Sequence, residues 1–175
     1  MLVPFVPSPP EVVEEMLKCA NLSKDDVLLD LGCGDGRIIK AAKKNFHVRM
    51  AIGVEINNDL CLEARDPDVE VVCGDMVLLL ETLMPKVTDP DVEVVCGDMV
   101  LLLETLMPKV TVITAYLSTR TNEIIQEKIL KLGRKGLRIV SHDFVFEKLR
   151  LKETRRVKAM GLLGWTEHTI YCYEL

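Results

Sequence analysis

Residues 26–46 read DVLLDLGCGDGRIIKAAKKNF, and the fold can be inferred from this segment. Asp26 to Leu31 form an apolar run typical of a buried strand, and Gly36 to Asn45 place apolar side chains at helical spacing. Glycines at positions 32, 34 and 36 lie between the two. Glycine lets the backbone turn tightly and lets a ligand approach without obstruction by a Cβ atom. The stretch therefore predicts a strand, a ligand-binding turn and a helix.

Apolar runs alternate with helical patterns along the rest of the chain. Further strands are expected over residues 50–55, 110–116 and 137–140, and further helices after Ser8, after Asn57 and near Asn122. Residues 155–175 alternate enough for a hairpin around Gly161 and Gly164. Strands and helices in regular order predict a parallel sheet that is covered on both faces. We expect a single doubly wound α/β domain over residues 1–175, mostly parallel, with a C-terminal antiparallel hairpin.

Two acidic residues mark the ends of the first two expected strands. Asp30 directly precedes the glycine turn, and Glu55 follows Gly36 by 19 residues (55 − 36), where an acid suits hydrogen bonds to ribose hydroxyls. Dinucleotide-binding turns read G-x-G-x-x-G, whereas the third glycine here is one place early. A carboxylate at Asp30 would repel a pyrophosphate but attract a ligand that carries an ammonium and a sulfonium. The residues therefore favour S-adenosylmethionine (SAM), and a dinucleotide-dependent dehydrogenase is the main competitor.

Several segments resemble class I (seven-strand) SAM-dependent methyltransferases, which have a Rossmann-like sheet. Within that class, the chain is most similar to small protein-lysine methyltransferases of the archaeal and mitochondrial type. The N-terminal V-P-x-V-P-S-P element and the later S-H-D-F element narrow the resemblance to this group. The segments that carry it are VPFVPSPPEVVEEML (3–17), DLGCGDGRII (30–39), GVEIN (53–57), CGD, TAYLSTRTNE (114–123) and RIVSHDF (138–144).

The resemblance implies a role for each matching residue. Asp30, Gly32 and Gly34 would line the methionine end of SAM, and Glu55 would hold the ribose. The Gly-Asp after the third strand would meet the adenine amino group. Residues 3–8 would close over the cofactor, and Tyr116 would sit near the transferable methyl group. After Phe144 the chain departs from its relatives, which continue with a proline- and tryptophan-containing segment, whereas a basic run stands here.

A perfect repeat interrupts the expected order of elements. Residues 66–88 read DPDVEVVCGDMVLLLETLMPKVT, and residues 89–111 repeat them letter for letter. Each copy is one strand and one helix, so the chain contains two candidates, Asp75 and Asp98, for the adenine contact. Either the copies form two successive strands and Asp75 makes the contact, or the first copy loops out and Asp98 makes it. The sequence leaves the origin of the repeat open.

Composition excludes several classes of protein. The chain has 175 residues, 49% of them hydrophobic and 28% charged, which is an ordinary globular mixture. Its net charge of −5 argues against sequence-independent binding to nucleic acid. No apolar run approaches the roughly 18 residues of a membrane span, and no secretory leader pattern is present. None of the six cysteines has metal-ligand spacing. We therefore expect no metal, a cytoplasmic location and cysteines that act mostly as small buried hydrophobes.

Four positions near the expected site have two interpretations each. The Asp35 carboxylate could either contact the ligand or interact with the dipole at the N-terminus of the following helix. Ser8 is favoured as a helix cap, because Ser8-Pro9-Pro10-Glu11 matches a capping box. His142 with Asp143 could be an acid–base pair, although a structural role is favoured. Cys33 is expected to pack rather than react, and His47 and His168 carry no signal.

These observations predict a SAM-dependent enzyme that transfers a methyl group to a lysine side chain of a protein by in-line displacement. A nucleic-acid amine is a less suitable acceptor, because Thr114-Ala115-Tyr116-Leu117 replaces the (D/N)-P-P-(Y/F) element of enzymes that act on it. A small-molecule methyltransferase is the enzymatic alternative. A SAM-binding protein inactivated by the repeat is the alternative outside enzymes.

Overall fold

The computed structural model describes residues 5–74, 107–161 and 163–175. The part of the chain that it describes contains one seven-stranded sheet with the order β3-β2-β1-β4-β5-β7-β6. The first five strands in this order pair in parallel, and β7 runs antiparallel to both β5 and β6. This confirms the mostly parallel sheet with a C-terminal hairpin. The strands are β1 Val27–Leu31, β2 Met50–Glu55, β3 Glu70–Cys73, β4 Val112–Ala115, β5 Arg138–His142, β6 Leu151–Gly161 and β7 Gly164–Glu174.

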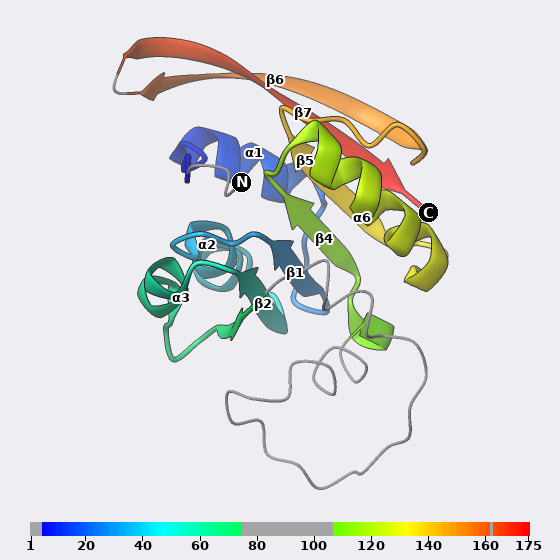
Figure 1. Cartoon of the computed structure of the whole chain (residues 1–175), viewed down its shortest axis with the longest axis horizontal. Helices are drawn as coiled ribbons and strands as arrows, with labels where there is room; N and C mark the ends of the chain where they lie inside the picture. Colours follow the sequence, from blue (N-terminus) through cyan, green and yellow to red (C-terminus); the bar gives the residue numbers. More distant parts are fainter. Residues whose placement is uncertain (1–4, 75–106, 162) are drawn as a thin grey trace, which may run out of the picture.

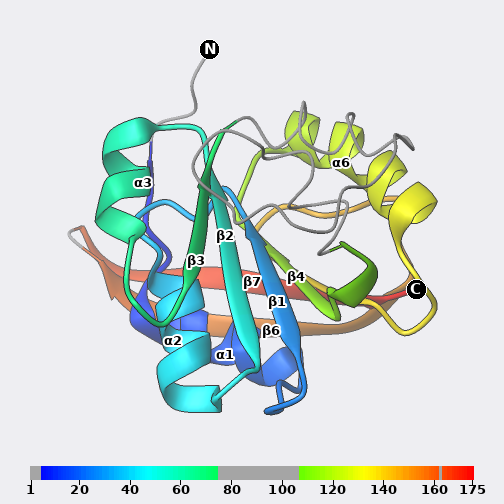
Figure 2. The ribbon, with the colours of Figure 1, turned by 90° about the horizontal axis from the view of Figure 1, so that it is seen from below.

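Helices cover both faces of the sheet (Figures 1 and 2). On one face, α1 (Pro10–Cys19) and α2 (Arg37–Phe46) pack against Leu28 and its neighbours. On the other, α6 (Thr119–Leu132) packs against Leu29 and Leu31. Successive strand residues point to opposite faces, which is why β1 is buried along its whole length. The remaining helices within the described residues are α3 (Asn58–Ala64) beside β2 and β3 and the short 3₁₀ turn Met107–Lys109.

The helix ends confirm some of the predicted caps and correct others. Asn57 caps α3, because its side chain accepts hydrogen bonds from the backbone amides of Asp59 and Leu60. The prediction that Ser8 caps α1 is wrong: Pro9 occupies the cap position and Ser8 makes its contact elsewhere. Gly133 ends α6 with an extended backbone (φ −69°), not with the left-handed conformation that is common for glycine at helix ends.

The first copy of the repeat supplies the third strand. Residues Ile52 to Glu55 of β2 pair with residues Glu70 to Cys73 of β3, so this strand of the first copy lies beside β2. The last residues of the second copy lead into β4, where the Thr111 hydroxyl donates to the Asp26 carboxylate over 2.7 Å. Asp75, Asp98 and the expected additional strand lie outside the described residues.

Two disulfides correct the expectation about the cysteines. Cys19 at the end of α1 is bonded to Cys172 of β7, and Cys61 of α3 is bonded to Cys73 of β3. Cys33 is buried with a free thiol, as expected. The partners in each pair belong to different elements, and in the first pair they are 153 residues apart in sequence. Spacing along the chain therefore does not reveal these pairs.

The basic run from residue 148 to 158 lies largely on β6, the edge strand of the sheet. Its side chains form exposed ion pairs, among them Lys152 with Glu174 and Arg156 with Glu167. Charged side chains on an edge strand discourage pairing with another chain. None of the helices in the described ranges is long and apolar enough to span a membrane.

Candidate functional site

The glycine turn between β1 and α2 lies at the carboxyl edge of the parallel strands, where doubly wound sheets bind ligands. Gly34 and Gly36 have positive φ angles of 57° and 80°, which other residues rarely adopt. Both are also tightly enclosed: a Cβ atom on Gly34 would lie 2.3 Å from the Phe5 ring, and one on Gly36 would lie 3.0 Å from Ala64. The turn therefore requires glycine at these two positions.

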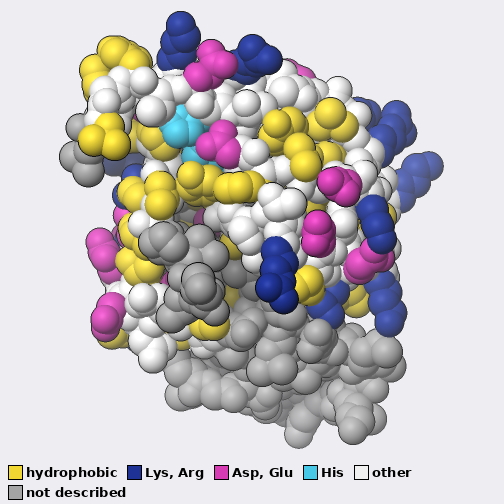
Figure 3. Space-filling view, turned by 45° about the horizontal axis from the view of Figure 1, so that its top comes forward, with side chains coloured by type: hydrophobic (Ala, Val, Ile, Leu, Met, Phe, Trp, Pro, Cys, Tyr) yellow, Lys and Arg dark blue, Asp and Glu magenta, His cyan; other side chains and the backbone are white. Residues whose placement is uncertain are grey.

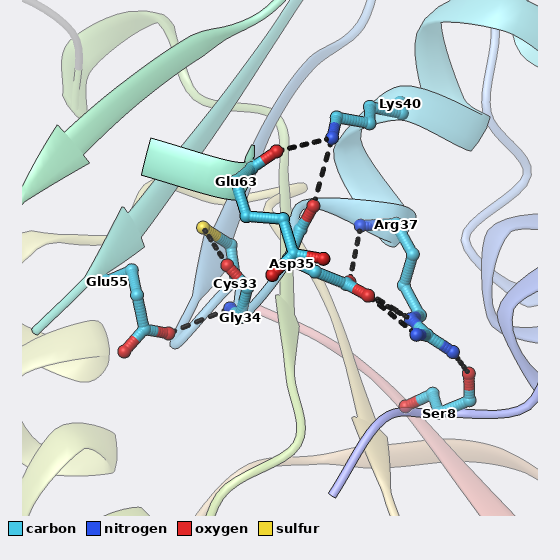
Figure 4. Close-up of polar contacts among 8 residues, drawn as sticks. All are labelled: Ser8, Cys33, Gly34, Asp35, Arg37, Lys40, Glu55 and Glu63. Atoms are coloured by element: carbon cyan, nitrogen blue, oxygen red, sulfur yellow. Dashed lines mark hydrogen bonds and ion pairs between the residues drawn. The ribbon is translucent and has the colours of Figure 1, made fainter. Parts of the chain in front are cut away.

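Glu55 at the end of β2 reaches across to this turn (Figure 4). One carboxylate oxygen accepts the Gly34 amide over 2.8 Å, and the other accepts the Asn57 amide over 2.9 Å. Each carboxylate oxygen has a second lone pair, so both can still accept a hydroxyl. The structure thus brings Glu55 and the glycine turn together, as expected from the sequence.

Asp30 of β1 is almost fully buried, with 2% of its surface exposed. Thr114 of the neighbouring strand β4 donates its hydroxyl to the Asp30 carboxylate over 2.8 Å. Burial raises the pKa of Asp30 to about 7; the Thr114 hydrogen bond opposes this shift, and the charges of Glu55 and Asp35 add to it. A nearby cation would stabilise the charged form of this buried carboxyl group. It is therefore suited to a positively charged ligand.

Asp35 lies on the turn but is already paired within the protein (Figure 4). The Arg37 guanidinium donates to its carboxylate over 2.6 Å and also donates to the backbone carbonyl of Ser8 over 2.9 Å. Although burial alone would raise the pKa of Asp35, the hydrogen bonds and charge of Arg37 lower it. Asp35 and Arg37 thereby tie the N-terminal segment to the glycine turn. Phe5, whose ring lies against Gly34, is part of the same N-terminal segment.

Cys33 lies within the turn with its thiol buried, and burial raises its pKa well above the usual range. A cysteine reacts as the thiolate, so this thiol is inert. Its sulfur also fills the space beside Gly53, where a Cβ atom would lie only 2.5 Å away. The structure supports the expected packing role.

Tyr116 follows β4 and stacks on His142 at the end of β5, with 3.8 Å between the ring centroids. His142 is fully buried, and its Nδ1 lies 2.9 Å from the Ser8 hydroxyl. Burial raises the pKa of Tyr116, and the charge of Asp143 adds to the shift. The Tyr116 side chain is therefore uncharged, and it lies at the carboxyl edge of the sheet.

Sequence reasoning missed His168. Its Nδ1 lies 2.9 Å from His142 Nε2, although it comes from β7 on the C-terminal hairpin. An alternating strand gives no indication of which residue on it will face a distant strand end. The register of the β5–β7 pair brings the two histidines together.

Comparison with known proteins places the chain in a family. The sequence profile of the ANTKMT methyltransferase domain matches residues 30–153, which include the glycine turn, Glu55 and Tyr116. The chain belongs to the ANTKMT methyltransferase family. It is therefore a SAM-dependent methyltransferase with the class I fold. A protein-lysine N-methyltransferase from Saccharolobus islandicus is 36% identical over 174 residues, which cover 99% of this chain and 94% of that protein.

Solved structures agree with the fold of this ANTKMT-family chain. An RNA methyltransferase from Salinibacter ruber, in complex with S-adenosylhomocysteine, has a TM-score of 0.69 and 28% identity over 97% of this chain and 93% of its own. A precorrin-6y C5,15-methyltransferase from Geobacter metallireducens has a TM-score of 0.65 at 14% identity, over 99% and 93% of the two chains. At that identity the second likeness concerns the fold alone.

Proposed function

We propose that this methyltransferase acts on lysine side chains of a protein. The observation that carries the proposal is the 36% identity, over nearly the whole length of both chains, to a protein-lysine N-methyltransferase. The likeness extends beyond the part that binds a cofactor. It includes the N-terminal segment and the C-terminal strands, and in this proposal these segments build the acceptor side of the site.

The site residues support a definite placement of SAM. In this proposal, Asp30 faces the cationic methionine end over Gly32 and Gly34, and Glu55 holds the ribose. Glu55 is held in place by two backbone amides, so it is oriented before the ligand arrives. The adenine contact stays assigned to the Gly-Asp of the repeat, at Asp75 or Asp98. Asp75 is favoured because the first copy supplies the strand beside β2.

The reaction is an in-line displacement in which the lysine nitrogen attacks the methyl carbon while the bond from that carbon to sulfur breaks. The site must align three atoms and exclude water. Tyr116 and Phe5 provide apolar surface beside the turn, and Arg37 fastens the segment that carries Phe5. The lysine has to lose its proton before attack, and a low-dielectric surrounding favours this by lowering its pKa.

A protein acceptor fits the charge of the chain better than a nucleic acid does. The net charge is −5, and three basic side chains of β6, those of Lys152, Arg155 and Arg156, form ion pairs with acids. The similar structure from Salinibacter ruber is an RNA methyltransferase, so RNA is the acceptor against which the proposal must be tested.

The test uses SAM with a deuterated methyl group, a cell extract, and the purified chain. After incubation, the protein, RNA and small-molecule fractions are separated and analysed by mass spectrometry. The proposal expects deuterated methyl groups on lysine side chains in the protein fraction. Glu55→Ala, which should lose SAM binding, is the control and should leave no label.

Three outcomes contradict the proposal. Label that appears only in the RNA fraction assigns a nucleic-acid acceptor, and label only among small molecules assigns a small-molecule methyltransferase. SAM binding without transfer to any fraction indicates a protein inactivated by the repeat.

A further inference from the structure

Three metal-binding side chains converge where the C-terminal hairpin meets β5. They are His142, Asp143 and His168, and the ligand atoms that they offer all lie within 4.8 Å of one another. His142 Nε2 is 2.9 Å from His168 Nδ1, and each of these nitrogens is 3.3 Å from Asp143 Oδ2. The three atoms therefore form a compact, nearly equilateral triangle. Figure 3 shows histidine at the surface beside an acidic side chain, with hydrophobic side chains around them.

The dimensions of the triangle match those of three ligands on one metal ion. Zinc binds imidazole nitrogen and carboxylate oxygen at about 2.0–2.2 Å. Two such ligands that subtend an angle between about 90° and 110° at the ion are about 3.0–3.4 Å apart. The separations of 2.9 and 3.3 Å agree with this geometry.

Each of the three side chains also has a hydrogen-bond partner on its other polar atom. His142 Nδ1 lies 2.9 Å from the Ser8 hydroxyl, and His168 Nε2 lies 2.8 Å from the Thr166 hydroxyl. The other oxygen of Asp143 accepts the Thr169 amide over 2.8 Å. Metal ligands have such outer partners as a rule, because these fix the ring orientation and the tautomer. The outer partners use other atoms, so Nε2 of His142, Nδ1 of His168 and Oδ2 of Asp143 lie 2.9–3.3 Å from one another without being engaged by them.

The backbone and the burial favour the same conclusion. Asp143 has a positive φ of 59°, an unusual conformation for a residue with a side chain, and this turns the chain directly after β5. His142 is fully buried, so its position is fixed by the packing around it. The side chains of His168 and Asp143 are 14% and 32% exposed, which gives an ion a path from solvent.

We propose that His142, Asp143 and His168 form a binding site for a divalent transition-metal ion of the zinc type, with its fourth position open to solvent. The site joins β5 to β7, and through Ser8 it reaches the N-terminal segment. The Tyr116 ring packs against one of its ligands, and Tyr116 is the residue expected near the transferable methyl group. The proposal does not depend on the identity of the methyl acceptor.

Zinc binding to untagged, metal-free protein tests the proposal, by calorimetry and by elemental analysis after dialysis. The protein is kept without reductant so that its disulfides stay closed. We expect one zinc ion per chain. We expect Asp143→Asn and His168→Ala each to weaken binding at least tenfold, and Thr166→Val to weaken it by about tenfold through the second partner. Asparagine tolerates the positive φ at position 143, so this variant should keep the local fold.

His47→Asn is the matched control, because His47 is exposed at the end of α2 and far in sequence from the cluster. Cobalt serves as a spectroscopic probe: bound to wild type, it should give visible absorption bands that Asp143→Asn changes and His47→Asn leaves alone. Circular dichroism confirms that each variant is folded. A wild-type chain that binds no zinc would overturn the proposal and identify a hydrogen-bonded cluster only. Zinc binding that survives both Asp143→Asn and His168→Ala would overturn it as well.

Discussion

At the residue scale, the properties of the site depend on where two carboxylates lie at the strand ends. Asp30 and Glu55 were predictable, because the carboxyl ends of neighbouring parallel strands meet at one edge of a sheet. The residues that contact Asp30 and His142 were not predictable. Thr114 and His168 come from strands distant in sequence, and only the strand register brings them to Asp30 and His142. Ser8 matched a local pattern for a helix cap, but a tertiary hydrogen bond to His142 takes its place.

Asp30 should make SAM binding depend on pH. Its pKa is about 7, so it is neutral below that pH and charged above it. A cationic ligand prefers the carboxylate, and SAM affinity should therefore rise by up to about tenfold between pH 6 and 8. Asp30→Asn should bind SAM more weakly and show no such rise. Calorimetric titrations across this range measure both effects.

S-adenosylhomocysteine is the control ligand in that experiment, because it lacks the sulfonium charge. It should distinguish less between wild type and Asp30→Asn. An Asp30→Asn variant whose SAM affinity still follows the wild-type pH profile contradicts the assigned role of this carboxylate.

Thr114→Val should move the same pH profile in a known direction. The Thr114 hydroxyl stabilises the charged form of Asp30, so its removal raises the pKa of that carboxyl further. The midpoint of the SAM affinity curve should shift above that of wild type, with little change at the highest pH. A shift to lower pH would show that another group controls the profile.

At the element scale, the N-terminal segment is attached through side chains that do not follow from its own sequence. Arg37 at the start of α2 connects the Ser8 carbonyl to Asp35 on the glycine turn. Helix α1 itself was predictable from its apolar spacing and from Pro10 at its first position. The anchoring of the segment before it was not, because it depends on contacts between separate elements.

Arg37→Met should release this segment while keeping the helix. We expect SAM affinity to fall several-fold, and limited proteolysis within the first ten residues to become faster, because a charge-assisted hydrogen bond is lost. Lys44→Met, an exposed position on the same helix, is the matched control. If Arg37→Met and Lys44→Met behave alike in both assays, the anchor has no role in cofactor binding.

The link between α1 and β7 should be a major source of stability. Cys19 and Cys172 are 153 residues apart, and a disulfide that closes so long a loop contributes about 2–4 kcal/mol by restricting the unfolded chain. Cys19→Ser should lower the free energy of unfolding in urea by about this amount without reductant. With dithiothreitol the variant and the wild type should converge. A difference that persists under reduction would point to packing instead.

At the scale of the whole molecule, the sheet and its helical layers followed from alternating strand and helix patterns. Each of these patterns is local, and the order of a doubly wound sheet has few alternatives. The repeat was the exception. Its two copies are identical, so nothing in the sequence of either copy indicates which one forms the third strand. The structure gives the third strand to the first copy.

Deletion of residues 66–88 should stabilise the protein. It leaves a second copy of identical sequence, which can form β3 and can pair its cysteine with Cys61. It also removes one apolar segment, MVLLLETLM, that the usual fold has no position for. We expect a higher melting temperature, less aggregation and unchanged SAM affinity. A deletion variant that melts at a lower temperature than the full chain would contradict this.

We propose that Asp30 and Glu55 bind SAM together across the glycine turn. A crystal structure of the chain with S-adenosylhomocysteine tests it most directly. We expect a ribose within hydrogen-bonding distance of the Glu55 carboxylate and a methionine end that passes Gly32 and Gly34 toward Asp30. A ligand bound elsewhere, or a ribose that does not contact Glu55, would contradict it.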